Sequence, residues 1–401
     1  MTNTALAQLV SDRARRAGPA RANDPRGSSR MISFYAGFPD PASLPKHDII
    51  EATRVALERD GEWALQYGAT QGYPGLIEEL LAKLARDQGI RAKPENVLIT
   101  NGASQALSLI VDLFVDPDDV ILSEAPTWMG AVNNFRAAGA VVREIAVDDE
   151  GIDVAALERE LDVLQNNGLQ PKLLYMIPNF QNPTGVTTTL ERRNAVVSLA
   201  ARHGMPIVED DAYFDLRFSG DTLPTLYELN RDGRVIYMGT FSKIMAAGMR
   251  LGWAIADADV ISMLAGLKHE GGTSPFAGQV AAEFCSSGTL VEHVVELKAL
   301  YRSRRDTMLA ALKREMPDGA HWTTPDGGFF IWVTLPEQVS ASAILPLARE
   351  RNVEFLAGTG FYFHGAGDNA MRLSYSFADE GQIDEGIGIL GQLVREQAAH
   401  R

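Results

Sequence analysis

The most informative stretch of the chain, residues 239–253, reads GTFSKIMAAGMRLGW. It follows a short apolar, strand-like run and sets one lysine, Lys243, among hydroxyl-bearing and small residues, with Arg250 seven positions later. A lysine amine can form an imine with an aldehyde, while Thr240, Ser242 and Arg250 can together hold a phosphate group. The stretch therefore predicts a site for a molecule with both groups, although an ordinary basic loop would have a similar composition.

Composition sets the broad class. The chain has 401 residues, of which 46% are hydrophobic and 22% charged, the proportions of a globular protein with one large or two smaller domains. Its formal net charge of -15 disfavours nucleic acid and anionic membranes as partners. The single cysteine, Cys285, excludes an intrachain disulfide and fits a reducing compartment. Without a spanning apolar run or a secretion signal, a cytoplasmic protein is expected.

The first thirty residues differ from the rest. Six arginines occur between residues 13 and 30, interspersed with glycine and proline. This composition is typical of a solvated basic tail that becomes ordered only against other parts of the protein. An arm that gates a substrate site is the alternative interpretation.

From about residue 95, short β-rich runs alternate with longer amphipathic segments. The expected strands are residues 97–100, 120–123, 141–145, 173–177, 207–210, 235–238 and 253–255. Helical patterns between them cover residues 104–114, 129–138 and 190–203. This alternation predicts an α/β fold with a mostly parallel seven-stranded sheet and helices on both faces. After a helical pattern at 279–316, apolar runs at 328–335, 353–356 and 371–376 predict a smaller α+β domain.

Polar clusters follow the expected strands, and ligands of open α/β sheets bind beyond the carboxyl ends of strands. Small residues before Ser104 could leave backbone N–H groups free for an anion, or Ser104 could simply cap a helix. Asn182 precedes a proline, which holds it extended and aims its amide by the backbone; it could serve a phenolate oxygen or a plain turn. Trp128 could stack on a flat heterocycle or belong to the core.

Three acids at 209–211 end a buried strand, which is costly unless at least one has a cationic partner. A carboxylate such as Asp210 can pair with a pyridinium nitrogen, and Tyr213 could then approach a ring oxygen. A metal is the rival interpretation, but no histidine lies close in sequence. Arg372 lies inside an apolar strand-like run and needs an anion, either a ligand carboxylate or an internal acid. The cofactor that unites these features is pyridoxal phosphate.

These motifs resemble those of fold type I pyridoxal phosphate enzymes of the class I/II aminotransferases. Within them the chain is most similar to the branch that holds 2-aminoadipate and kynurenine aminotransferases. The resemblance runs from about residue 32 to the C-terminal helix. It rests on GFP at 37–39, ALQY at 64–67, NPTG at 182–185, DDAY at 210–213, SK at 242–243 with Arg250, and the segments 325–332 and 371–375.

The resemblance implies a role for each matching residue. Lys243 would form the internal aldimine and move the proton, with Asp210 on the pyridine nitrogen and Tyr213 on the ring oxygen. Other cofactor contacts are implied for Ala103, Ser104, Trp128, Asn182, Thr240, Ser242 and Arg250. The substrate carboxylate would lie against Gly37, Asn182 and Arg372. Tyr67 would reach the phosphate from a partner subunit, which implies a homodimer with shared sites.

The expected function is transfer of an amino group between an L-amino acid and a 2-oxo acid. Decarboxylation, elimination or oxidation on the same cofactor is the alternative, because this fold does not fix the reaction type. A ligand-sensing regulator domain is disfavoured, since only about thirty residues precede the match. No metal is expected. The expected division is an arm with part of the small domain (1–46), a large cofactor-binding domain (47–285) and a small domain (286–401). The chain departs from the residues usual in these enzymes at Phe38, Ala103, Trp128 and 247–248, and its N-terminal arm has no match. The resemblance therefore does not identify the substrate.

Overall fold

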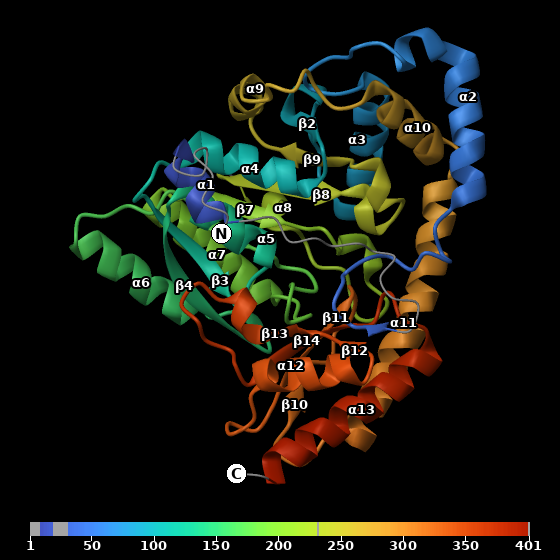
Figure 1. The fold of residues 1–401 in the computed structure, drawn as a ribbon. Helices are drawn as coiled ribbons and strands as arrows, with labels where there is room; N and C mark the ends of the chain where they lie inside the picture. Colours follow the sequence, from blue (N-terminus) through green and yellow to red (C-terminus); the bar gives the residue numbers. More distant parts are fainter. Residues whose placement is uncertain (1–8, 19–30, 231, 400–401) are drawn as a thin grey trace.

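The computed structural model describes residues 9–18, 31–230 and 232–399. Figure 1 shows a large central sheet covered by helices and, beside it, a smaller sheet flanked by the C-terminal helices. Within the described ranges, no helix is long and apolar enough to cross a membrane.

The large sheet has the strand order β2-β9-β8-β7-β6-β3-β4-β5. Its strands are β2 (Val97–Thr100), β3 (Val120–Ala125), β4 (Val141–Asp148), β5 (Gly151–Ile152), β6 (Leu174–Met176), β7 (Ile207–Asp210), β8 (Val235–Thr240) and β9 (Gly252–Ile255). Strands β4, β3, β6, β7 and β8 pair in parallel, whereas β9 is antiparallel to both β2 and β8. The predicted, mostly parallel α/β sheet is confirmed. The eighth strand, β5, was not expected, because two residues are too short for a periodic pattern.

Helices cover both faces of this sheet. Those that precede or accompany it are α1 (Asp12–Ala17), α2 (Lys46–Ala64), α3 (Pro74–Gln88), α4 (Ala103–Phe114), α5 (Met129–Ala138), α6 (Val154–Asn166), α7 (Leu190–His203), α8 (Leu226–Leu229), α9 (Ala258–Gly266) and α10 (Pro275–Ser286). Side chains alternate across the strands: Tyr175 packs on the side of α4, α5 and α9, and its neighbours Leu174 and Met176 pack on the side of α6 and α7. Burial on both faces explains why these strands read as continuous apolar runs.

The small sheet is antiparallel, with the order β10-β11-β14-β13. It comprises β10 (His321–Trp322), β11 (Phe330–Thr334), β13 (Leu356–Ala357) and β14 (Ala370–Ser374), packed with α11 (Thr289–Glu315), α12 (Ala341–Glu350) and α13 (Glu380–Ala399). The prediction of one strand at 353–356 is wrong. Its first half, β12 (Val353–Glu354), pairs with β1 (Ile32–Ser33) in a separate ribbon, and its second half joins β14.

Part of the basic N-terminal segment is helical. Helix α1 packs against α5, Arg13 forms a 2.7 Å ion pair with Asp112 of α4, and Arg16 donates to the carbonyl of Ala137 at 3.3 Å. The other residues of the predicted arm, 1–8 and 19–30, lie outside the described ranges. The helical part is thus docked on the large domain beside the site described next.

Candidate functional site

A cavity of about 180 Å³ lies at the carboxyl ends of β2, β3, β6, β7 and β8. The antiparallel β9 begins at the same edge, which brings Arg250 there as well. Most residues predicted for the site line this cavity: Ala103, Ser104, Trp128, Asn182, Asp210, Tyr213, Thr240, Ser242, Lys243 and Arg250. The shared edge of the sheet therefore brings together residues that are up to 147 positions apart in the sequence, from Ala103 to Arg250.

Asp210 lies at the base of the cavity and is 4% exposed. The Tyr175 hydroxyl donates to its Oδ2 at 2.6 Å, whereas Oδ1 is buried without a hydrogen-bond partner in the described structure. Burial raises the pKa of Asp210 to about 6, opposed by the Tyr175 hydrogen bond and by the charge of Lys243. A buried carboxylate with one free oxygen fits a protonated ring nitrogen. The sequence did not reveal Tyr175, because an aromatic residue inside an apolar strand looks like core.

The Lys243 amine faces the same cavity. Its Nζ donates to the carbonyl of Gly37 at 2.9 Å, which places a third predicted region at the site. Burial lowers the pKa of Lys243 to about 8, and the nearby charges of Arg372 and Arg250 act in the same direction while Asp210 opposes them. The amine is consequently far easier to deprotonate than an ordinary lysine, as a nucleophile or general base requires.

An anion site surrounds the start of α4. Gly102, not Ser104, is the N-cap of this helix, so the interpretation of Ser104 as a simple cap is wrong and its hydroxyl remains available. A Cβ on Gly102 would lie 2.9 Å from Nη2 of Arg250, and one on Gly252 would lie 2.6 Å from the backbone nitrogen of Ala103. The two glycines therefore keep helix N–H groups and a guanidinium open to one ligand, the arrangement that binds phosphate.

The hydroxyls of Thr240 and Ser242 lie on the same side of the cavity. Thr240 Oγ1 accepts a hydrogen bond from the Ser242 backbone at 3.1 Å, and the two hydroxyl oxygens are 2.9 Å apart. Thr240 caps the short helical turn that carries Lys243. The lysine and the two hydroxyls are thus fixed by a single turn after β8.

An adjoining cavity of about 760 Å³ contains Arg372 and Gly37, and it shares Trp128, Asn182, Tyr213 and Lys243 with the first. Arg372 is 5% exposed. It donates to Asn182 Oδ1 at 3.0 Å and to the carbonyl of Tyr35 at 2.5 Å. Burial lowers its pKa to about 10, so the guanidinium stays charged at neutral pH.

Arg372 makes no ion pair with any acid in the part of the chain that the structure describes. The interpretation of Arg372 as half of an internal salt bridge is therefore wrong there. Its guanidinium carbon lies 4.1 Å from the ring centre of Phe330, and Nε is buried without a partner. A buried cation without a counter-ion beside an open cavity is suited to a ligand carboxylate.

Gln181 joins the two loops that carry Trp128 and Asn182, and the sequence did not indicate this role. Its amide nitrogen donates to the Pro126 carbonyl at 2.7 Å, and its amide oxygen accepts from the Thr184 hydroxyl at 2.8 Å. The neighbouring Glu124 carboxyl is fully buried, and burial raises its pKa to about 8. Buried hydrogen bonds of the Gln181 side chain therefore connect the two loops.

Tyr67 is the one predicted site residue that the structure does not bring to either cavity. Its side chain is 87% exposed. Within one chain it lines neither the cavity that contains Arg250 nor the one that contains Arg372.

Comparison with known proteins agrees with the geometry. Residues 31–390 match the family described as Aminotransferase class I and II. Aromatic-amino-acid aminotransferase 1 of Thermococcus litoralis is 38% identical over 92% of this chain and 89% of its own length. The 2-aminoadipate transaminase of Thermus thermophilus is 38% identical over 91% and 90%. The structure of Pyrococcus horikoshii kynurenine aminotransferase superposes with a TM-score of 0.93 at 37% identity, covering 98% of both chains.

The Tyr175 hydrogen bond provides a test of the Asp210 site. In Tyr175→Phe the carboxylate loses a donor, so the pKa of Asp210 rises further and less carboxylate is present at neutral pH. We expect the affinity of the cofactor-free protein for pyridoxal phosphate to fall about tenfold, measured by absorbance titration. Tyr227→Phe is the control, because that hydroxyl donates to no described residue. Equal affinities in both variants would show that Tyr175 does not support the site.

Proposed function

The chain belongs to the class I and II aminotransferases and is a pyridoxal phosphate-dependent enzyme acting on amino acids, and we propose that Lys243, Asp210 and Arg372 carry its catalytic functions. The observation that supports these roles is the convergence of three differently suited groups on two joined cavities. They are a lysine with a lowered pKa, a buried carboxyl with a free oxygen and an arginine without a counter-ion.

The residues present fit the cofactor. Asp210 Oδ1 is available to the ring nitrogen, Asn182 and Tyr213 to the ring oxygen, and Trp128 to the ring face. Ser104, Thr240, Ser242 and Arg250, with the backbone at Ala103, would hold the phosphate. When bound, pyridoxal phosphate supplies an aldehyde and an electron-withdrawing ring that stabilises negative charge on the substrate Cα.

The protein's own groups perform the binding and the proton transfer. Arg372 binds the α-carboxylate bidentately, which orients the Cα–H bond relative to the ring and so selects the bond that breaks. The neutral Lys243 amine removes the Cα proton as a base, and the resulting ammonium group gives a proton back as an acid. A pKa of about 8 suits both directions of this transfer near neutral pH.

Aromatic or long aliphatic amino acids are the substrate class that we propose. Tyr35, Phe38 and Leu356 line the larger cavity, whereas Phe34 is fully buried and belongs to the core. Relatives named for aromatic amino acids and for kynurenine support this choice, whereas the relative named for 2-aminoadipate takes an acidic side chain. The composition and the single cysteine, Cys285, support a cytoplasmic location. We also propose that the chain divides into three parts, with boundaries at residues 46 and 285.

A half-reaction tests the proposed roles. Protein loaded with pyridoxal phosphate and mixed with phenylalanine, without a 2-oxo acid, should convert its cofactor to the amine form and release one equivalent of the 2-oxo acid. Borohydride should attach the cofactor to Lys243 in the unmodified protein and to no residue in Lys243→Ala. Release of carbon dioxide instead would favour the decarboxylation alternative, and attachment to another lysine would refute the role of Lys243.

We also propose a homodimer in which Tyr67 of one subunit contacts the phosphate in the other. Its 87% exposure in the single chain supports a contact completed by a partner. Sedimentation should give twice the 43.6 kDa mass of one chain. Tyr67→Phe should weaken binding of pyridoxal phosphate about fivefold and leave binding of pyridoxal, which lacks the phosphate, unchanged. An equal effect on both ligands would contradict a phosphate contact.

A further inference from the structure

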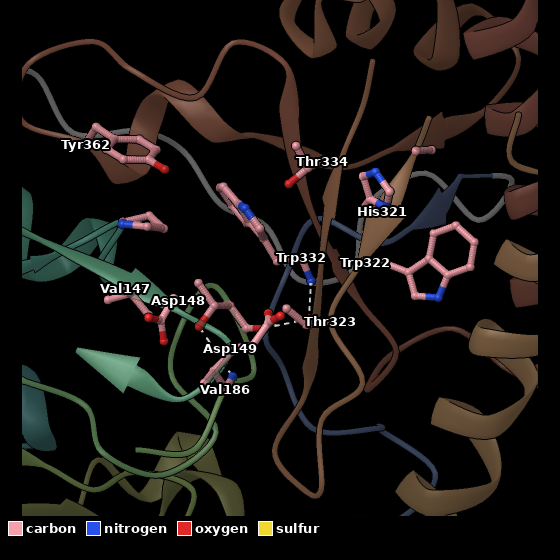
Figure 2. Close-up of a pocket in the computed structure, with 13 residues that line it drawn as sticks. Val147, Asp148, Asp149, Val186, His321, Trp322, Thr323, Trp332, Thr334 and Tyr362 are labelled. Atoms are coloured by element: carbon pink, nitrogen blue, oxygen red, sulfur yellow. Dashed lines mark hydrogen bonds between the residues drawn. The ribbon is translucent and has the colours of Figure 1, made fainter. Parts of the chain in front are cut away.

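A third cavity, of about 710 Å³, lies between the large and the small sheet and shares no lining residue with the two cavities above. Figure 2 shows its walls. From the large sheet come Val147, Asp148 and Asp149 at the end of β4, with Pro126, Thr184 and Val186; from the small domain come residues 320–323, Trp332, Thr334 and Tyr362. Neither the aminotransferase reaction nor the substrate proposal uses it.

Trp332 stands at the centre of this cavity, between Tyr362 and Thr323 (Figure 2). Alternation along β11 places Phe330, Trp332 and Thr334 on one face, and Phe330 supports Arg372 in the substrate cavity. Trp332 is 8% exposed and packs edge-on against Phe361, with 5.6 Å between ring centres. Its backbone N–H donates to the Thr323 hydroxyl at 3.1 Å, and its indole N–H donates to no described residue. A nearly buried polar group is therefore left without a protein partner in a residue that lines the cavity.

The mouth of the cavity carries uncompensated negative charge. Arg192 pairs with Asp148 at 2.6 Å and with Glu150 at 3.0 Å. Asp149 lies between these two acids, is exposed and has no cationic partner within the described ranges. One arginine thus faces three carboxylates. Of the two that line the cavity, Asp148 is paired with Arg192, and Asp149 has no cationic partner among the described residues.

The aromatic side chains of the cavity, like its acidic residues, favour a positively charged ligand. The faces of Trp332 and Tyr362 carry the negative lobe of their ring quadrupoles, which attracts cations, whereas the Trp322 ring points away from these residues and packs on the core (Figure 2). The hydroxyls of Thr334 and Tyr362 and the indole N–H add polar contacts, while Val147 and Val186 add apolar surface. A bare metal ion does not fit, because no group of three or more acid, histidine or cysteine side chains converges in the described part of the chain.

We propose that this cavity is a second small-molecule site, which binds an organic cation with an ammonium group and a compact apolar or aromatic body. Asp149 pairs with the ammonium group, and Trp332 and Tyr362 contact the body. Since the site shares no residue with the catalytic cavities, its ligand binds whether or not an amino acid is present.

Benzyltrimethylammonium is a suitable probe, because its quaternary nitrogen cannot condense with the aldehyde of the cofactor. Calorimetric titration of the pyridoxal phosphate-loaded protein should show one saturable site. Asp149→Asn should weaken binding about fivefold through the lost charge pair, and Trp332→Leu should weaken it by about as much or more. Addition of phenylalanine should not displace the probe.

Two controls separate this site from non-specific attraction to an acidic protein. Asp259→Asn removes the same charge from an exposed position on α9, at the opposite edge of the large sheet, and should leave affinity unchanged. Benzenesulfonate, an anion of similar size, should not displace the bound probe. The proposal is overturned if the probe does not saturate, if Asp149→Asn binds as tightly as the unmodified protein, or if benzenesulfonate displaces the probe. Because Asp149 is exposed, its variant remains informative even if Trp332→Leu does not fold.

Discussion

A carboxyl group held away from water with only one oxygen satisfied is the constraint on which the site depends. Tyr175 stabilises one oxygen of Asp210, and the other faces a cavity at the sheet edge. Leaving a buried acceptor unpaired costs about 1–3 kcal/mol, and burial correspondingly raises the pKa of the group. A cationic ring nitrogen removes this cost, so the folded chain is prepared for such a ligand before it binds.

Three cationic side chains near Asp210 determine which other groups a ligand of this site can carry. Arg250 lines the smaller cavity, Arg372 lines the larger one, and Lys243 lines both. The positive charges of the two arginines lower the pKa of Lys243. In the proposed roles, a bound phosphate and a bound carboxylate would neutralise these two charges, and ligand binding would therefore change the pKa of Lys243. The fold supplies this geometry through the shared edge of parallel strands and through β9, whose antiparallel direction returns Arg250 to that edge.

The sequence predicted the sheet and most lining residues because strand-end motifs combine unusual residue types with a topological rule. It did not predict Tyr175 or Gln181, whose roles depend on what faces them across the sheet. Tyr175 sits in an apolar run, and the Gln181 amide could equally have faced solvent. The split of 353–356 between two sheets also depends on distant partners, Ile32 for Val353 and Arg372 for Leu356. Periodicity cannot indicate such pairings.

The most direct test concerns the ring nitrogen. Nitrogen NMR of the protein loaded with isotopically labelled pyridoxal phosphate should show a protonated pyridine nitrogen at neutral pH, hydrogen-bonded to Asp210. The same signal should move to the unprotonated position in Asp210→Asn, because an amide cannot stabilise the positive charge. An unprotonated nitrogen in the unmodified protein would contradict the account, since the free oxygen of Asp210 would then have no cationic partner.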